Sequence, residues 1–151
     1  SLYKIVKPDG FIILSLPNKY PSLDCLHWYT KLLPQASAEY ASTIPTQQEL
    51  CDWLDEHAFQ LVAIQKPKKE LMLKKEIYYN PSGIYDPCWI SCDPFWDHVE
   101  KKDMMRIERI ISTLFKQMKI YRYIEEVDKD RETYGQVYFI IARKTPYRVM
   151  Y

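Results

Sequence analysis

One uncharged and almost wholly apolar run, residues 11–16, constrains the fold of this chain more than any other feature. It follows the turn Pro8-Asp9-Gly10, where proline presets φ and glycine tolerates a positive φ. A strand exposed on one face would alternate apolar with polar residues, whereas an unbroken apolar run is typical of a strand that helices cover on both faces of a mostly parallel sheet. The sequence therefore predicts a strand at 11–16 that is buried on both faces.

The composition favours one globular domain. The chain has 151 residues, of which 47% are hydrophobic and 15% aromatic, and a chain of this length buries about two thirds of its unfolded surface. Its four cysteines are not needed as disulfide staples in so apolar a chain. We therefore expect a single domain over residues 1–151 in the reducing environment of the cytoplasm. Residues 2–6 look like the end of a helix, so we also expect the natural protein to extend further upstream.

Charge and glycine content argue against two classes of binding function. With 21 basic and 20 acidic residues the net charge is +1, which provides no electrostatic basis for a nucleic-acid or membrane partner. The chain has only three glycines, so it can form neither the G-x-G-x-x-G loop of dinucleotide-binding folds nor a phosphate-binding P-loop. We therefore expect no glycine-rich cofactor loop, no nucleic acid and no membrane.

Local patterns predict several further elements. Thr46-Gln47-Gln48-Glu49 has the spacing of a capping box, so a helix is expected to start there. Its apolar residues Leu50, Trp53 and Leu54 recur at helical spacing. The other expected elements are a strand at 59–65, an aromatic-rich loop at 80–96, one long amphipathic helix at 97–127, a charged turn at 128–133 and a strand at 136–143, with a loop at 35–45.

The order of these motifs resembles the C-terminal half of a class I S-adenosylmethionine-dependent methyltransferase. Lys7-Pro8-Asp9-Gly10 is similar to the LKPGG turn that precedes the fifth strand of that family. The capped helix that starts at Thr46 and ends just before Phe59 resembles the helix before the family's sixth strand. Ala142-Arg143-Lys144 resembles the end of its seventh. The resemblance omits residues 68–132, which we interpret as a variable loop and a long helix inserted into the domain.

The resemblance implies an α/β fold with a partial Rossmann-like sheet of three strands, the last one antiparallel, and flanking helices. The 11–16 strand would lie between a missing fourth strand and the 136–143 strand, with the 59–65 strand beyond. The half that holds S-adenosylmethionine is missing, so this cofactor is expected in the complete domain and not in this chain alone. The open apolar edge at 11–16 should pair with the missing N-terminal half or with a second copy of the chain.

Two positions depart from the family's pattern. Asp9 replaces the first glycine of the turn, and aspartate tolerates turn conformations. Ala58 stands where the family has its helix-ending glycine, and a left-handed backbone would cost an alanine about 1 kcal/mol there. Neither departure rules out the fold.

The region after the 11–16 strand holds the candidate site. Loops at the carboxyl ends of strands form the ligand crevice of open α/β sheets, and in the resembled family this region commonly faces the acceptor. A small-molecule acceptor is therefore expected to contact Pro17, Asn18, Lys19, Tyr20, Trp28 and Tyr29. His27 is a candidate general base, because an imidazole titrates near neutral pH. Core packing of a short helix is the alternative interpretation of His27 and Trp28.

Two other patterns are weaker. Cys88, Cys92 and His98 suggest zinc, but C-x-x-x-C followed by one histidine is not a structural zinc pattern and offers no fourth ligand, so we expect no metal. The basic residues of 116–122, together with Tyr121 and Tyr123, could suggest an RNA-binding stripe. Helical spacing favours an ordinary solvated face instead.

Two hypotheses about function follow. In the first, the chain is the substrate-side half of a methyltransferase and is inactive without the donor-binding half. In the second, it is a noncatalytic interaction module that completes the sheet of another chain through the edge of the 11–16 strand.

Overall fold

The computed structural model describes residues 2–19, 26–69, 71 and 74–146. The chain divides into two compact units, which we call the sheet unit and the helical unit. The sheet unit consists of Ser1–Pro17, Ile44–Lys66 and Val137–Tyr151, and the helical unit of Asn18–Thr43 and Pro67–Gln136. The helical unit is therefore made from two segments that interrupt the sheet unit in sequence.

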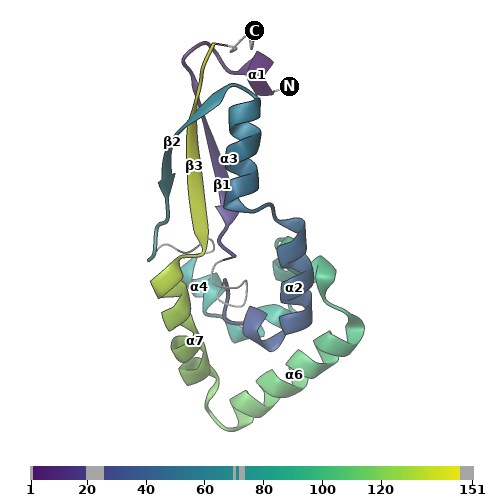
Figure 1. Cartoon of the computed structure of the whole chain (residues 1–151). Coiled ribbons are helices and arrows are strands. Elements are labelled where there is room, and N and C mark those ends of the chain that lie inside the picture. The colour runs from purple at the N-terminus through teal and green to yellow at the C-terminus, as the bar shows by residue number, and fades with distance from the viewer. Residues whose placement is uncertain (1, 20–25, 70, 72–73, 147–151) are drawn as a thin grey trace. The chain divides into compact units, whose positions relative to one another are not determined.

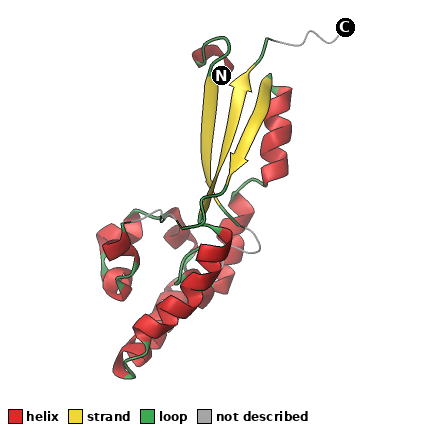
Figure 2. Cartoon of the chain, turned by 90° about the vertical axis from the view of Figure 1, so that its left-hand side faces the viewer, coloured by secondary structure: helices red, strands yellow, loops and turns green. Residues whose placement is uncertain are grey.

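The sheet unit holds three strands, β1 (Phe11–Pro17), β2 (Phe59–Gln65) and β3 (Val137–Lys144). Their order is β1-β3-β2, and both pairs are antiparallel, so β1 and β2 run in the same direction. Figure 2 shows the three strands side by side. The predicted strand order and the reversed direction of the last strand are confirmed, as is the α/β class with flanking helices.

Helix α3 (Gln47–Glu56) covers one face of this sheet. The capping box that begins it is present: the Thr46 hydroxyl accepts from the Glu49 amide at 3.1 Å, and the Glu49 carboxylate accepts from the Thr46 amide at 2.6 Å. Leu54 of α3 packs in one apolar cluster with strand residues such as Ile12 and Ile140. The short helix α1 (Leu2–Ile5) contributes Tyr3 to the same cluster.

Strand β1 is not buried on both faces, so that prediction is wrong. Ile12 is buried, but Phe11 is 58% exposed and Ile13 is 65% exposed. The physical reason is that, in the part of the sheet unit that the structure describes, α1 and α3 both pack against the cluster on one face. The apolar run therefore has one covered and one bare side.

Among the described residues of the sheet unit, two that are not glycine have a left-handed backbone. Asp9 and Ala58 both have φ of 60°, a region that costs a residue with a Cβ atom roughly 1 kcal/mol. Arg143 donates to the Asp9 carboxylate at 2.9 Å and so fastens the turn before β1 to β3. Ala58 follows the C-cap His57 of α3, where glycine is the usual residue.

The helical unit contains three helices of ten residues or more, α2 (Pro34–Thr43), α6 (Lys101–Lys116) and α7 (Ile120–Tyr134) (Figure 1). Short helices α4 (Lys75–Tyr78) and α5 (Pro87–Ser91) join them, with 3₁₀ turns at Thr30–Leu32, Pro81–Tyr85 and Pro94–His98. The core is mainly aromatic and isoleucine-rich. Its largest fully buried members are Trp28, Tyr29, Leu33, Tyr78, Ile84, Phe95, Ile107, Ile111, Ile120 and Ile124.

The predicted loop at 35–45 is wrong, because α2 occupies most of it. Pro34 is the first residue of this helix, because proline is tolerated at a first helical position, where its missing N–H is not needed. Only the small residues Ala36 and Ser37 of α2 are buried. Small buried residues give a weak apolar period, so the helix has little signal in the sequence.

The single long helix at 97–127 and the charged turn at 128–133 are also wrong. The chain breaks at Gln117–Lys119, where Met118 has φ of 55°, and helix α7 then continues through residues 128–133 to Tyr134. The charged residues of that segment do not make a turn because Asp128 and Arg131 lie buried within the helix and pair with each other.

The left-handed Ala58 supplies a stability prediction. Ala58→Gly removes the contact of Cβ with the backbone and should raise the free energy of unfolding of the sheet unit by about 0.5–1 kcal/mol, measured by urea denaturation. Ala63→Gly is the matched control, because Ala63 lies inside β2, where glycine should lower stability by about 0.5–1 kcal/mol. Equal destabilisation by both variants would contradict the prediction.

Candidate functional site

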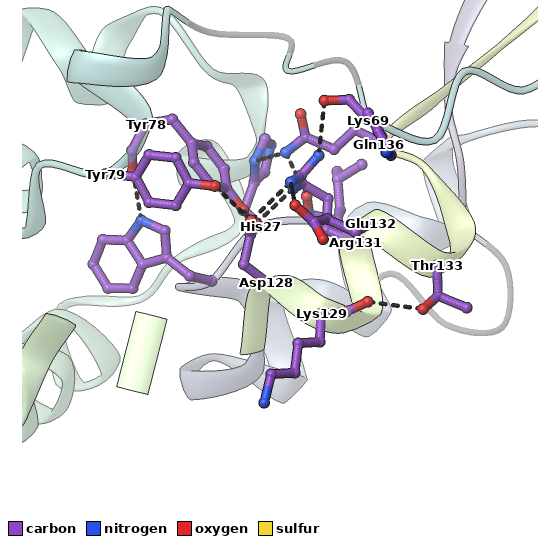
Figure 3. A network of polar contacts seen from close by, with 12 residues as sticks. His27, Lys69, Tyr78, Tyr79, Asp128, Lys129, Arg131, Glu132, Thr133 and Gln136 are labelled. Atoms are coloured by element: carbon purple, nitrogen blue, oxygen red, sulfur yellow. Dashed lines mark hydrogen bonds and ion pairs between the residues drawn. The ribbon is translucent and has the colours of Figure 1, made fainter. Parts of the chain in front are cut away.

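A buried ion pair lies at the centre of the polar groups of the helical unit (Figure 3). Both belong to α7: Arg131 Nε donates to Asp128 Oδ1 at 2.6 Å, and its Nη2 donates to Oδ2 at 2.7 Å. The hydroxyls of Tyr78 and Tyr79 donate to the same carboxylate at 2.8 and 2.5 Å. A spacing of three residues puts the two charges on one face of the helix, and Tyr78, the last residue of α4, and Tyr79, its C-cap, complete the carboxylate's hydrogen bonds.

These contacts fix the protonation states of the pair. Burial alone would raise the pKa of Asp128, but the hydrogen bonds from Arg131, Tyr79 and Tyr78 outweigh burial and lower the pKa below its ordinary value. Burial and the nearby Asp128 carboxylate raise the pKa of Tyr78, and burial with the same hydrogen bond raises that of Tyr79 to about 12. At neutral pH the site is therefore a carboxylate held by one guanidinium and two neutral phenols.

His27 is a second buried polar group of the helical unit. The Gln136 side-chain amide donates to the Leu26 carbonyl at 2.7 Å, and its nitrogen lies 3.0 Å from His27 Nδ1. Nδ1 then accepts, which leaves the proton on Nε2, 3.8 Å from Asp93 Oδ2. Burial lowers the pKa of His27 to about 4, with Arg131 adding to the effect and Asp93 opposing it. His27 is therefore a neutral imidazole near pH 7.

The aromatic side chains around His27 pack closely. Tyr29 stacks between the rings of His27 and Trp96, and its hydroxyl donates to Asp93 at 2.5 Å. The indole of Trp28 donates to the Tyr78 carbonyl at 2.8 Å. Trp28 and Tyr29 are both completely buried.

The structure brings some of the predicted site residues together and separates others. His27, Trp28 and Tyr29 share the core of the helical unit. Asn18 donates through its amide to the Tyr134 and Gly135 carbonyls, and Lys19 donates to the Ala41 carbonyl. Pro17 ends β1 in the sheet unit, and Tyr20 lies outside the described residues.

Acceptor binding by these residues stays a prediction. Because Trp28 and Tyr29 are fully buried, a ligand could reach them only after the helical unit opens. His27 has the neutral state that a general base requires, but its ring is also buried. The burial of His27 and Trp28 agrees with the alternative interpretation, in which both pack in the core.

Sequence reasoning missed the central members of this network, namely Asp128, Arg131, Tyr78 and Asp93. One signal could have found the first two, since opposite charges three residues apart in a helix lie within reach of each other. No local pattern connects Tyr78 to Asp128, or Asp93 to Tyr29. Those contacts join residues about 50 or more positions apart.

The glycines of this chain do not fit a pocket for S-adenosylmethionine. A Cβ atom at Gly10 would lie 2.9 Å from the Lys7 carbonyl, one at Gly83 would lie 2.9 Å from the Trp89 ring, and one at Gly135 would lie 2.5 Å from the Pro67 carbonyl. Close packing of neighbouring atoms therefore explains each glycine, because a Cβ atom would not fit there. None of the three leads from a strand into a helix, as a donor-binding loop requires. No chemical step through this cofactor can be assigned to the chain.

Metal and membrane features can be stated for the described ranges alone. Within residues 2–19, 26–69, 71 and 74–146, no three histidine, cysteine or acidic side chains gather closely enough to hold a metal ion, and Cys88, Cys92 and His98 form no such group. Across the same ranges no helix combines the length and apolar character needed to cross a bilayer.

Comparisons with models of protein families, with curated proteins and with solved structures find nothing that matches this chain.

The buried ion pair supplies a second stability prediction. Asp128→Asn removes the buried carboxylate that neutralises Arg131 through two short hydrogen bonds, and it should lower the free energy of unfolding of the helical unit by about 3 kcal/mol. The control is Asp130→Asn on the same helix, which removes only an exposed pair with Lys31 and should cost less than about 1 kcal/mol. Chemical denaturation of both variants measures the difference, and equal losses would contradict the assigned role of Asp128.

A third prediction concerns pH. The unfolded chain protonates His27 near pH 6.5, but the folded chain does so only near pH 4. The contribution of His27 to stability is therefore complete above pH 6.5 and falls as the pH drops toward 4. Between pH 7 and about pH 5 the loss should be roughly 2 kcal/mol. His27→Gln should remove this part of the slope in urea denaturation, and an identical slope in the variant would contradict the prediction.

Proposed function

We propose that this chain is the substrate-side half of an S-adenosylmethionine-dependent methyltransferase with a Rossmann-like sheet. The observation that carries the proposal is the reversed strand β3 between the two parallel strands β1 and β2. This is the order and direction that the resemblance implies for the last three strands of that family. The intervening helix α3 also stands where the resemblance requires a helix.

Two turn residues support the same proposal. Asp9 and Ala58 occupy positions where the family's pattern has glycine, and both have a left-handed backbone. A left-handed backbone is the physical reason for a glycine at such a position. The departures from the family's motifs are therefore changes of residue type and not of backbone conformation.

The outer edge of β1 is where the donor-binding half would join. The Lys144 amide donates to the Gly10 carbonyl at 2.8 Å, next to the Phe11–Arg143 pair. Hydrogen-bonded and non-bonded pairs alternate in an antiparallel ladder. The backbone groups of Phe11, Ile13 and Ser15 therefore point away from β3, and among the described strands none lies on that side.

The second candidate function, a noncatalytic interaction module, rests on this same edge. The strand has no charge, no internal proline and no bulge, so it lacks the features by which natural edge strands avoid pairing. A partner that adds a strand here would not need to bind S-adenosylmethionine. Donor binding therefore distinguishes the two functions.

The test compares this chain with the whole polypeptide of its open reading frame by calorimetric titration with S-adenosylmethionine. The 151-residue chain should not bind the donor. The longer polypeptide should bind it, and Ile13→Lys should weaken that binding, because a lysine on the outer side of β1 opposes strand pairing. Val62→Lys, at the exposed bulge of β2, is the matched control and should leave binding unchanged.

Three results would count against the proposal. Micromolar donor binding by the 151-residue chain alone would mean that it contains a donor pocket. Failure of the whole polypeptide to bind S-adenosylmethionine would favour the interaction module. Equal effects of Ile13→Lys and Val62→Lys on donor binding would show that the donor-binding half does not join at the edge of β1.

A further inference from the structure

The turn between α6 and α7 exposes three large apolar side chains. Phe115 is 37% exposed, Met118 is 92% exposed and Tyr121 is 61% exposed. Every residue from 115 to 119 is exposed. Within the helical unit this turn joins the ends of two helices whose buried residues, among them Ile111, Ile120 and Ile124, pack elsewhere in the core. The apolar side chains of the turn are therefore not part of that packing.

The backbone of Met118 makes its side chain an unexpected choice. Helix α6 ends in a Schellman motif, in which the Met118 amide donates to the Phe115 carbonyl at 2.9 Å and the Lys119 amide donates to the Leu114 carbonyl at 2.8 Å. The residue after the C-cap in this motif is left-handed and usually glycine. Met118 occupies it with φ of 55°. Stability of the helix end thus favours glycine, and methionine adds an exposed apolar group instead.

Basic residues precede, interrupt and follow this apolar tip in the sequence. From residue 109 to residue 124 the sequence contains Arg109, Lys116, Lys119 and Arg122 and no acidic residue. All four are exposed. Arg122 pairs with Glu126, four residues further along α7, at 3.0 Å. The tip therefore carries a local positive charge although the whole chain is nearly neutral.

We propose that the α6–α7 turn is a peripheral binding site for an anionic lipid surface. Phe115, Met118 and Tyr121 would enter the interface, and the basic side chains would contact the lipid headgroups. Apolar residues flanked by lysine and arginine match both layers of such a surface.

An anionic lipid surface fits this tip better than single-stranded nucleic acid. Nucleic-acid sites of this kind place aromatic rings where bases can stack. The most exposed of the three apolar residues is Met118, at 92%, and its side chain offers no ring for a base to stack on. This inference is independent of the proposed methyltransferase function, because it uses neither the sheet unit nor the acceptor-site residues.

The test is sedimentation of the 151-residue chain with vesicles. The probes are vesicles of phosphatidylcholine with about one third phosphatidylserine and vesicles of phosphatidylcholine alone. We expect binding to the anionic vesicles, weakening with added salt, and little binding to the neutral ones. Lys116→Gln and Lys119→Gln should each weaken binding about fivefold.

Met118→Gly is the decisive variant. It should weaken vesicle binding on the order of tenfold because the inserted side chain is lost, while its melting temperature should stay the same or rise because glycine suits the left-handed position. Loss of binding therefore cannot come from unfolding. Met105→Gln is the matched control: Met105 is another exposed methionine of α6, away from the turn, and its replacement should leave binding unchanged.

Several results would overturn the proposal. One is the absence of binding to anionic vesicles, and another is equal binding by Met118→Gly and the parent chain. A third is binding to single-stranded RNA that the two glutamine variants abolish and Met118→Gly leaves unchanged, because the basic residues would then serve a nucleic acid.

Discussion

The sheet unit depends on strand β3, which is the last strand in sequence and the central one in space. Both β1 and β2 hydrogen-bond to it, and they do not pair with each other. Lys144 at its end also donates to the carbonyls of Tyr3 and Val6, which fixes the N-terminal segment. The paired residues of β2 and β3 are therefore at least 74 positions apart in the sequence (139 − 65). Those of β1 and β3 are at least 120 positions apart (137 − 17). Such distant pairings are slow to form, because loop closure must precede them.

The packing of the helical unit depends on buried polar groups and not on strand pairing. These groups have few alternative partners. Asp128 and Arg131 are buried together, and Tyr78 and Tyr79 satisfy the remaining positions of the carboxylate. Trp28 then donates to the Tyr78 backbone, and the Tyr123 hydroxyl donates to the Trp28 carbonyl. A buried charge without its partner is costly, so alternative packings that break the pair are disfavoured. The network connects the segment after β1 with the segment after β2.

Features that depend on a few adjacent residues could be predicted from the sequence. The capping box at Thr46 and the three strands belong to this class. Features that depend on distant neighbours could not. An apolar run has the same composition whether helices cover one or both of its faces, so the exposed face of β1 could not be predicted from the sequence. A charged segment likewise reads as a solvated turn unless its partners are known, which is why the place of Asp128 in α7 was missed.

The candidate site follows the same division. The sequence grouped His27, Trp28 and Tyr29 because they are adjacent, and the structure indeed places them in one core. It could not foresee that Asp93 would accept from Tyr29 and face His27, because that contact joins residues 64 positions apart. Nor could it foresee that these groups would be buried. Burial turns a constellation that resembles acid–base chemistry into one whose hydrogen bonds are already used by the protein itself.

Each unit keeps an apolar group at a position that its own stability does not require. In the sheet unit, Phe11 and Ile13 are exposed on an edge strand, where charged residues would cost little and would prevent pairing. In the helical unit, Met118 holds a left-handed position that suits glycine better. Folding of the isolated chain does not explain these choices, because none of the three side chains is buried. The association proposed for each surface would explain these positions, since an exposed apolar group gains free energy only when something else covers it.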